Sequence, residues 1–414
     1  MSLSPSYQSI FSSFIKSPVS TPAYIYSNQK LIQNISLFSE LTKKHLIQVH
    51  YAMKANNNAQ ILRMVKDAGL SVDVNSLGEL TQAMKIGFLP SNLIFAGVGK
   101  TDSELELAVK LGLKTIKVES VDELLVLSEI TNHLGISANI GLRLNPEIDA
   151  KTHPYIATGL ATSKFGIDKR DIDQIISILS NFPLLRLTTL DAHIGSQITD
   201  LNLFVDVFTF LSNQANFINK KGFSITDLDL GGGFAIEYDG SGQSTLPELD
   251  TLFSKIALLN NGAFKISIEP GRAVVANTCA ILTRVLYTKT NGDKNFAIVD
   301  AAMTDNIRPS LYGSVHPIVK IGQGSVSETL VYDVVGPVCE SGDFLGEDVS
   351  LSQCKRGDFL AILDSGAYTS AMASNYNMRP LLPEYLEKDG CLIEIRRRQN
   401  VNEWLENLEI PYEG

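Results

Sequence analysis

The sequence has little of several features that would place a protein in a narrow class. Its four cysteines are widely spaced, without a CxxC pair or a histidine at zinc spacing, so neither a disulfide framework nor a metal site is expected. The longest apolar runs are far shorter than the roughly 18 to 20 residues that span a bilayer. The first twenty residues also lack the apolar segment of a secretory signal. We therefore expect a cytoplasmic protein with no membrane partner.

Basic residues are also in the minority. Lysine and arginine number 35 against 45 aspartates and glutamates, which gives a net charge of −10. The longest basic run is the triplet Arg396-Arg397-Arg398, which is typical of a solvated surface. This balance argues against nucleic acid as a partner.

What the sequence does have is apolar content and length. Apolar residues make up 44% of 414 residues, enough for two packed domains or one large domain with an appendage. From about residue 45, short β-rich runs alternate with amphipathic stretches whose apolar residues recur at three- and four-residue steps. The runs begin near residues 47, 71, 92, 115, 138, 187, 225 and 265.

Eight strands, each followed by a helix, predict a closed (β/α)8 barrel. The alternative is an open doubly wound sheet, which usually has fewer strands and an early glycine-rich turn. Here the only GGG follows the seventh strand, which favours the barrel. The long link between the fifth and sixth strands, about residues 146–186, is expected to form an elaborated loop over the barrel mouth.

After about residue 272 the pattern changes to β-rich runs without long helices between them, as in a mostly antiparallel β-domain. The early run TPAYIYS, residues 21–27, predicts one more strand that pairs with this domain. We expect three segments: 1–30 joining the β-domain, 31–271 forming the barrel, and 272–414 forming the β-domain.

Polar residues stand where the predicted barrel strands end. In such barrels the chemistry collects at the C-terminal ends of the strands, and a purely structural barrel would not need polar side chains there. Read in chain order, those ends are Lys54, Asp73, Gly97, Glu119, Arg143, His193, Gly231 and Glu269.

Two of these residues have a chemical and a plainly structural interpretation. Lys54 suits Schiff-base chemistry with an aldehyde cofactor, because desolvation favours the nucleophilic amine; it could equally reach out to solvent. His193 could stack on an aromatic cofactor, although a lone histidine is more often a satisfied core residue.

The last two strand ends add LDLGGGF (228–234) and EPGR (269–272). Consecutive glycine N–H groups can cradle a phosphate, and the loops after strands seven and eight are the usual phosphate site of such barrels; the alternative is a tight turn. Glu269 could keep a pyridine nitrogen protonated and Arg272 could bind a carboxylate. A structural ion pair between them is the other interpretation.

Two later segments carry reactive side chains. Residues 303–313 offer Arg308 and Tyr312, and residues 336–345 offer Cys339, Glu340 and Asp343. Taken singly, each segment is also compatible with ordinary turn composition.

Together these motifs resemble the diaminopimelate decarboxylase family, of the alanine-racemase-like fold type (fold type III) of pyridoxal-phosphate enzymes. The resemblance spans about residues 50 to 380. It is carried by YAMKAN, HPYIATGLATSKFGI, HIGSQ, LDLGGGF, EPGR, TDNIRPSLY, GPVCESGD and GAYTSAMASNYNMRP.

The resemblance implies a role for each matching residue. Lys54 would bind the aldehyde of pyridoxal 5'-phosphate as a Schiff base, His193 would stack on the ring and Glu269 would bond its nitrogen. The phosphate would be held by Ser196, Gly231, Gly232, Gly233, Pro270, Gly271 and Arg272. The substrate's distal end would be bound by Arg272, Arg308 and Tyr312, with Tyr368 beside cofactor and substrate. Cys339, as a proton donor, and Glu340 would enter from the second subunit of a homodimer with shared active sites, and Asp73 and Arg143 would be supporting residues.

The implied reaction is decarboxylation of meso-2,6-diaminopimelate to L-lysine and CO2, the last step of lysine biosynthesis. The distal end of this substrate carries an amine and a carboxylate, which two arginines and a glutamate complement. An ornithine-type substrate ends in a bare amine, which two arginines would repel. The alternatives are a decarboxylase of another basic amino acid and a cofactor-carrying pseudoenzyme; the latter would have lost Lys54 or the Cys339 loop.

Overall fold

The computed structural model describes residues 3–149, 164–322 and 328–408, and the chain divides into two compact units. Unit 1 comprises Met1–Gln33, Ile236–Gln243 and Val275–Gly414, and unit 2 comprises Asn34–Ala235 and Ser244–Val274. Among the described residues, no helix combines the length and the apolar character that crossing a membrane requires.

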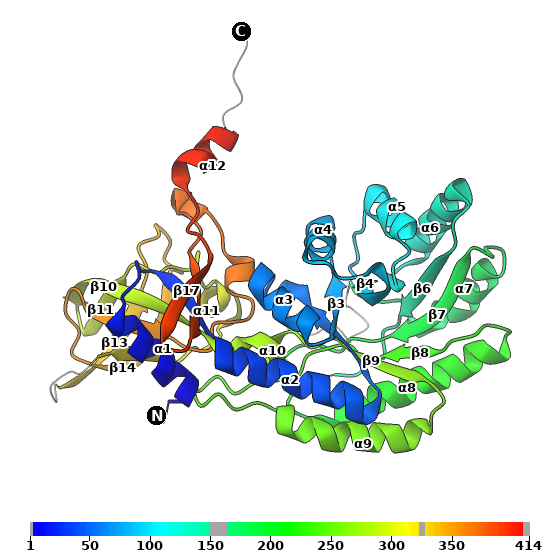
Figure 1. The fold of residues 1–414 in the computed structure, drawn as a ribbon, viewed down its shortest axis with the longest axis horizontal. Coiled ribbons are helices and arrows are strands. Elements are labelled where there is room, and N and C mark those ends of the chain that lie inside the picture. Colours follow the sequence, from blue (N-terminus) through cyan, green and yellow to red (C-terminus); the bar gives the residue numbers. More distant parts are fainter. Residues whose placement is uncertain (1–2, 150–163, 323–327, 409–414) are drawn as a thin grey trace, which may run out of the picture. The chain divides into compact units, whose positions relative to one another are not determined.

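Unit 2 is built on a closed barrel of eight parallel strands that follow one another in chain order (Figure 1). The barrel closes where the first strand pairs with the last, with Gln48 opposite Ser267 and Val49 opposite Ile268. This confirms the predicted (β/α)8 barrel. Its strands are β2 (Gln48–Ala52), β3 (Ser71–Val74), β4 (Leu93–Phe95), β5 (Thr115–Val118), β6 (Ala138–Arg143), β7 (Leu185–Asp191), β8 (Asp227–Asp229) and β9 (Lys265–Ile268).

Helices follow the barrel strands, as the three- and four-residue spacing predicts. Their ends carry the expected signals: Thr101 and Glu104 form a capping box at the start of α5, and Gly87, Gly112 and Gly135 end three successive helices in the left-handed conformation. The helices are α2 (Asn28–His45), α3 (Ala59–Asp67), α4 (Leu77–Ile86), α5 (Asp102–Leu111), α6 (Val121–Leu134), α7 (Ile172–Leu179), α8 (Asn202–Lys220), α9 (Leu249–Asn260) and α10 (Arg272–Val275). Short 3-10 turns are η1 (Met53–Ala55), η2 (Pro90–Asn92), η4 (Lys169–Asp171) and η5 (Leu246–Glu248).

Unit 1 contains a nine-stranded sheet in the order β14-β13-β11-β10-β1-β16-β17, with β15 pairing with both β10 and β12. All pairs are antiparallel except β1 with β16 and β11 with β13. Its strands are β1 (Ala23–Ser27), β10 (Cys279–Asn291), β11 (Lys294–Val299), β12 (Ile318–Ile321), β13 (Thr329–Val335), β14 (Phe344–Ser352), β15 (Phe359–Ile362), β16 (Glu384–Lys388) and β17 (Cys391–Arg396). The predicted N-terminal strand is thus β1, and it pairs with the C-terminal sheet through β10, with Ala23 opposite Leu282.

The sequence pattern did not predict α1 (Pro5–Lys16), whose residues Tyr7, Ile10 and Phe14 pack into the core of unit 1 against Leu282 and Leu363. The remaining helices of unit 1 are α11 (Arg308–Tyr312) and α12 (Val401–Leu408), with 3-10 turns η6 (Ala276–Thr278), η7 (Ser370–Met372) and η8 (Tyr376–Met378). The segment Ile236–Gln243 belongs to unit 1 although barrel residues flank it in sequence. The segment boundaries proposed above stay a prediction.

Candidate active site

Lys54 lies at the mouth of the barrel, in the turn η1 that directly follows β2. Its side chain is 40% exposed, and its Nζ lies 3.4 Å from Oδ2 of the fully buried Asp73 on β3. Asn75 donates a second hydrogen bond to the same oxygen. The amine is therefore held at the end of the strand by a carboxylate while it stays accessible from outside the barrel.

The glycines after β8 are required by close backbone approach. A Cβ on Gly232 would overlap the carbonyl oxygen of Glu269, and one on Gly233 would overlap the carbonyl oxygen of Gly195. Gly231 and Gly233 also have positive φ angles, of 69° and 104°, which favour glycine. The backbone of this loop is therefore packed directly against the residue that follows the eighth barrel strand, β9.

His193 follows β7 and faces the glycine loop. The Gly232 N–H donates to its Nδ1 over 3.1 Å. Desolvation, followed by the positive charges of Arg143 and Lys54, lowers the pKa of His193 well below its usual value. The imidazole is therefore neutral, with Nδ1 as an acceptor.

Arg272 connects the turn that follows β9 with the segment that follows β7. It is buried, and its Nη2 donates to Ser196 Oγ over 2.8 Å. The Ala52 N–H donates to the carbonyl of Pro270, and a Cβ on Gly271 would meet the Cβ of Ala55 at 2.9 Å. The EPGR turn is thus packed tightly against the segment that carries Lys54.

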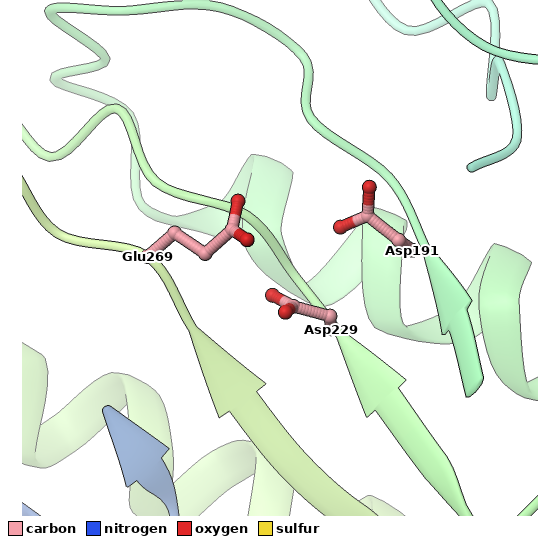
Figure 2. A group of neighbouring side chains, drawn as sticks. All are labelled: Asp191, Asp229 and Glu269. Carbon is pink, nitrogen blue, oxygen red and sulfur yellow. The ribbon is translucent and has the colours of Figure 1, made fainter. Parts of the chain in front are cut away.

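Glu269 directly follows β9 and is buried at 7% exposure. Its carboxylate converges with those of Asp191 on β7 and Asp229 on β8 (Figure 2), and Lys117 of β5 forms ion pairs with all three. Burial, followed by the charges of Asp229 and Asp73, raises the pKa of Glu269 well above its usual value, and Lys117 lowers it. This charged cluster lies inside the barrel, where branched apolar side chains are the usual filling.

Arg143 and Glu119 form a neighbouring pair. Arg143 Nη1 donates to Glu119 Oε1 over 3.2 Å, and Glu119 Oε2 accepts from the Gly166 N–H. Gly97, after β4, has a φ of 109°. These contacts order the strand ends without adding a further reactive group.

In unit 1, Arg308 and Tyr312 begin and end the short helix α11. The buried guanidinium of Arg308 lies 4.7 Å from the Tyr238 ring centroid and donates to the Tyr238 hydroxyl over 2.9 Å. Its Nη1 also lies 3.1 Å from His316 Nε2. Arg308 is thus a fixed cation that presents a planar donor group.

Cys339 and Glu340 are exposed, on the loop between β13 and β14. The Asp343 carboxylate accepts from the backbone N–H groups of Val338 and Met303, each over 2.6 Å, and Asn377 accepts from the Cys339 N–H over 2.9 Å. Hydrogen bonds to the Asp343 carboxylate therefore stabilise the conformation of this loop. Tyr368, after β15, is half-buried and has a φ of 56°.

The predicted residues fall into two sets, one in each unit. Lys54, His193, Ser196, the glycine loop and the EPGR turn lie at the carboxyl end of the barrel in unit 2, and the substrate-binding candidates Arg308, Tyr312, Glu340 and Tyr368 belong to unit 1 with Cys339. Residues 150–163 of the predicted mouth loop lie outside the described residues.

Sequence reasoning missed Lys117, Asp191, Asp229, Tyr238 and His316. A signal for Lys117 was present, because a lysine within the β-rich run TIKVES is as anomalous as Lys54. Tyr238 and His316 stand in segments with no strand pattern and no motif, so nothing pointed to them.

Comparison with known proteins agrees with this arrangement. The pyridoxal-binding domain of pyridoxal-dependent decarboxylases matches residues 29–276. A diaminopimelate decarboxylase from Aquifex aeolicus is 40% identical over 380 residues, 92% of this chain and 90% of that protein, and one from Vibrio cholerae is 39% identical over 386 residues, 92% and 91% of the two chains. The crystal structure of diaminopimelate decarboxylase from Helicobacter pylori complexed with L-lysine has a TM-score of 0.88 and 36% identity, covering 96% of this chain and 99% of that one. The chain therefore belongs to the diaminopimelate decarboxylases, within the family of pyridoxal-dependent decarboxylases.

Proposed function

We propose that this protein decarboxylates meso-2,6-diaminopimelate to L-lysine and CO2, the last step of lysine biosynthesis, with pyridoxal 5'-phosphate as its cofactor. The observation that carries the proposal is the grouping of Lys54, Glu269 and the Ser196–Arg272 pair at one end of the barrel. Family membership makes the protein a carboxy-lyase.

The residues at the barrel mouth fit this cofactor. We assign the phosphate to the loop Gly231–Gly233, whose glycines are required by close backbone packing, together with Ser196, Pro270, Gly271 and Arg272. Lys54 would bind the aldehyde, and Glu269 would hold the pyridine nitrogen protonated. When bound, the cofactor supplies an electron sink for the carbanion that loss of CO2 leaves behind.

His193 contributes a neutral, oriented ring. Because its Nδ1 accepts from the Gly232 N–H, the imidazole is fixed against the glycine loop and can lie flat on an aromatic ring. A neutral imidazole adds no positive charge beside the pyridine. We therefore assign His193 to stacking rather than to proton transfer.

Substrate recognition is assigned to a set of charged groups. Diaminopimelate carries an amine and a carboxylate at its distal end, and Arg272, Arg308 and Tyr312 would bind the carboxylate while Glu340 binds the amine. Tyr368 would lie beside cofactor and substrate. Arg308 suits this role because its guanidinium is already ordered by Tyr238 and His316.

Proton return to the reacting carbon is assigned to Cys339. After CO2 leaves, an acid must deliver a proton to Cα, and the Cys339 Sγ carries one, with Lys54 sharing the transfer. Both Cys339 and Glu340 are exposed in the single chain. This exposure supports a homodimer in which each subunit lends this loop to the active site of its neighbour.

We place the protein in the cytoplasm, with neither nucleic acid nor membrane as a partner. Its four cysteines are free, two of them exposed, which fits a reducing compartment. The net charge of −10 opposes binding to nucleic acid.

The test is turnover of defined amino acids by the purified holoenzyme. Incubation with meso-diaminopimelate should release CO2 and L-lysine in equal amounts, and ornithine and arginine should react far more slowly. Preferred turnover of ornithine or arginine would show that the substrate assignment is wrong.

A further inference from the structure

Lys117 is the residue in the barrel whose position most needs an explanation. It lies on β5, is fully buried, and takes no part in the reaction as described above. An unpaired ammonium in such a place would carry a large solvation penalty. A buried lysine is therefore retained only where its charge is fully compensated.

The compensation comes from three carboxylates on three separate elements. Lys117 Nζ lies 2.7 Å from Asp191 Oδ1 and 3.0 Å from Asp229 Oδ2, and it also donates to Glu269 Oε1. Figure 2 shows these carboxylates from the ends of β7, β8 and β9 turned toward a common centre. An ammonium has three N–H donors, and each has one carboxylate.

The charges of this cluster do not balance within the protein. Three carboxylates face Lys117, and Arg143, whose Nε lies 3.9 Å from Asp191 Oδ2, is also paired with Glu119, so carboxylates outnumber the cations in the fully ionised group. Burial raises the pKa of Asp191 to about 6, although Lys117 lowers it. A proton shared among the carboxylates, or a further cation, reduces the excess negative charge.

We infer that Lys117 is a positioning residue whose ammonium keeps Glu269 ionised and in place, so that the carboxylate can pair with the protonated pyridine nitrogen. That nitrogen adds a cation to a cluster in which carboxylates outnumber the basic groups. The inference rests on the proposed function, because it takes Glu269 as the partner of the cofactor ring.

The other charged groups around Glu269 determine whether a substitution raises or lowers the pKa of this carboxyl. They come from the neighbouring strands and turns: Lys54, Asp73, Lys117, Glu119, Arg143, Asp191 and Asp229, with the neutral His193 beside them. Among them, Lys117 is the cation that contacts the Glu269 carboxylate directly. Removing Lys117 therefore raises the pH at which Glu269 ionises, and removing the negative charge of Asp191 lowers it.

The test is equilibrium binding of pyridoxal 5'-phosphate to the apoenzyme between pH 5 and 8.5, followed by absorbance. In a plot of cofactor affinity against pH, Lys117→Met should move the midpoint upward by about one pH unit or more. At a pH where affinity is still rising, this shift means about tenfold weaker binding. Asp191→Asn should move the midpoint downward. The phosphate of the cofactor titrates in the same range, but identically for every variant.

Lys114→Met is the matched control. Lys114 directly precedes β5 and is largely buried, yet it contacts Gln48 and His50 and none of the three carboxylates. The same substitution there should shift the midpoint little, because Lys114 interacts with Asp229 only at a distance.

Opposite shifts for Lys117→Met and Asp191→Asn cannot come from loss of packing, which would weaken binding in both variants at every pH. If Lys117→Met does not fold, a downward shift in Asp191→Asn with little shift in Lys114→Met still supports the inference. Unshifted midpoints in the folded variants would overturn it while leaving the proposed function intact. Absence of cofactor binding by the wild-type protein would instead overturn both.

Discussion

Arg308 Nη1 donates a hydrogen bond to His316 Nε2 over 3.1 Å. The direction is certain, because a guanidinium has no acceptor, so Nε2 must be unprotonated. His316 Nδ1 then carries the proton and donates to the carbonyl of Leu363 over 2.9 Å. A neutral, buried histidine thus orients the arginine that we assign to the distal carboxylate of the substrate.

This relationship predicts that His316→Leu will weaken substrate binding. Loss of the acceptor leaves Arg308 less ordered, so KM for diaminopimelate should rise about tenfold, the equivalent of about 1.4 kcal/mol, with a smaller change in kcat. His316→Gln keeps an acceptor and should retain most of the affinity. Ser314→Ala is the control, because that hydroxyl lies 3.4 Å from Arg308 Nη2 and contributes little. Equal KM values for the leucine and glutamine variants would argue against this role.

A second prediction concerns Lys54. Lys54→Ala should lose more than about a hundredfold in kcat, because both cofactor attachment and proton transfer depend on its amine. Borohydride reduction of the wild-type holoenzyme should fix the cofactor to Lys54, as peptide mass spectrometry would reveal. Label on another lysine, such as the buried Lys117, would contradict the assignment.

Strand ends were the part of the site that sequence could predict. Lys54, Glu269 and Arg272 follow recognisable strands, and parallel strands in a barrel deliver their ends to one rim. Lys117 was not predicted as a site residue, because its position within a strand does not reveal whether its side chain faces the barrel interior or the helices. Its three carboxylates come from strands 74 to 152 residues further along the chain.

The helix α1 was not predicted for a different reason. Its sequence PSYQSIFSSFIK is rich in serine, a weak helix former. Its stability comes from burying Tyr7, Ile10 and Phe14 against the sheet of unit 1. Tertiary packing of this kind overrides local propensity and leaves little signal in a single sequence.

The glycine loop predicts a sharp contrast between two alanine substitutions. In Gly232→Ala the new Cβ would overlap the Glu269 carbonyl, so the backbone of both must shift. This overpacking costs about 1–3 kcal/mol or more. The thermal unfolding temperature and the affinity for pyridoxal 5'-phosphate should both fall. Gly99→Ala meets nothing within 4 Å and should change neither. Wild-type cofactor affinity in Gly232→Ala would show that the close approach is dispensable.

A fourth prediction follows from Tyr7 and Asp364 in unit 1. The Tyr7 hydroxyl donates to Asp364 Oδ1 over 2.7 Å. Burial raises the pKa of Asp364 to about 6, although the Tyr7 hydrogen bond lowers it. When the pKa of a carboxyl is higher in the folded than in the unfolded protein, folding stability falls as the pH rises from the unfolded-state pKa, about 4, to the folded-state pKa. Tyr7→Phe removes a donor to the ionised form, so the folded-state pKa rises further and the loss extends to higher pH.

The cost of Tyr7→Phe should therefore be larger at pH 8 than at pH 5, reaching about 1–3 kcal/mol for the buried carboxylate that loses a donor. Denaturation at the two pH values measures it. Tyr51→Phe is the control, because the equally buried Tyr51 donates to the backbone carbonyl of Asn56, a residue that does not titrate. A cost for Tyr7→Phe that is independent of pH would mean that Asp364 does not ionise in this range.

The last prediction tests the proposed sharing of active sites between subunits. Lys54→Ala and Cys339→Ala homodimers should each be nearly inactive. Mixed under conditions of subunit exchange, they form heterodimers in which one site carries both substitutions and the other carries neither. About half of the dimers are mixed at equal concentrations, and each has one intact site, so activity should recover to about a quarter of the wild-type value.

The recovery depends on Cys339 acting in the neighbouring subunit. If Lys54 and Cys339 of one chain served the same site, every site in the mixture would carry one substitution and no activity would return. Mass spectrometry of differently tagged chains establishes that exchange has taken place. A mixture with proven heterodimers and no activity would therefore assign the exposed loop of Cys339 and Glu340 to its own chain, because exchange can restore a site only when two chains build it.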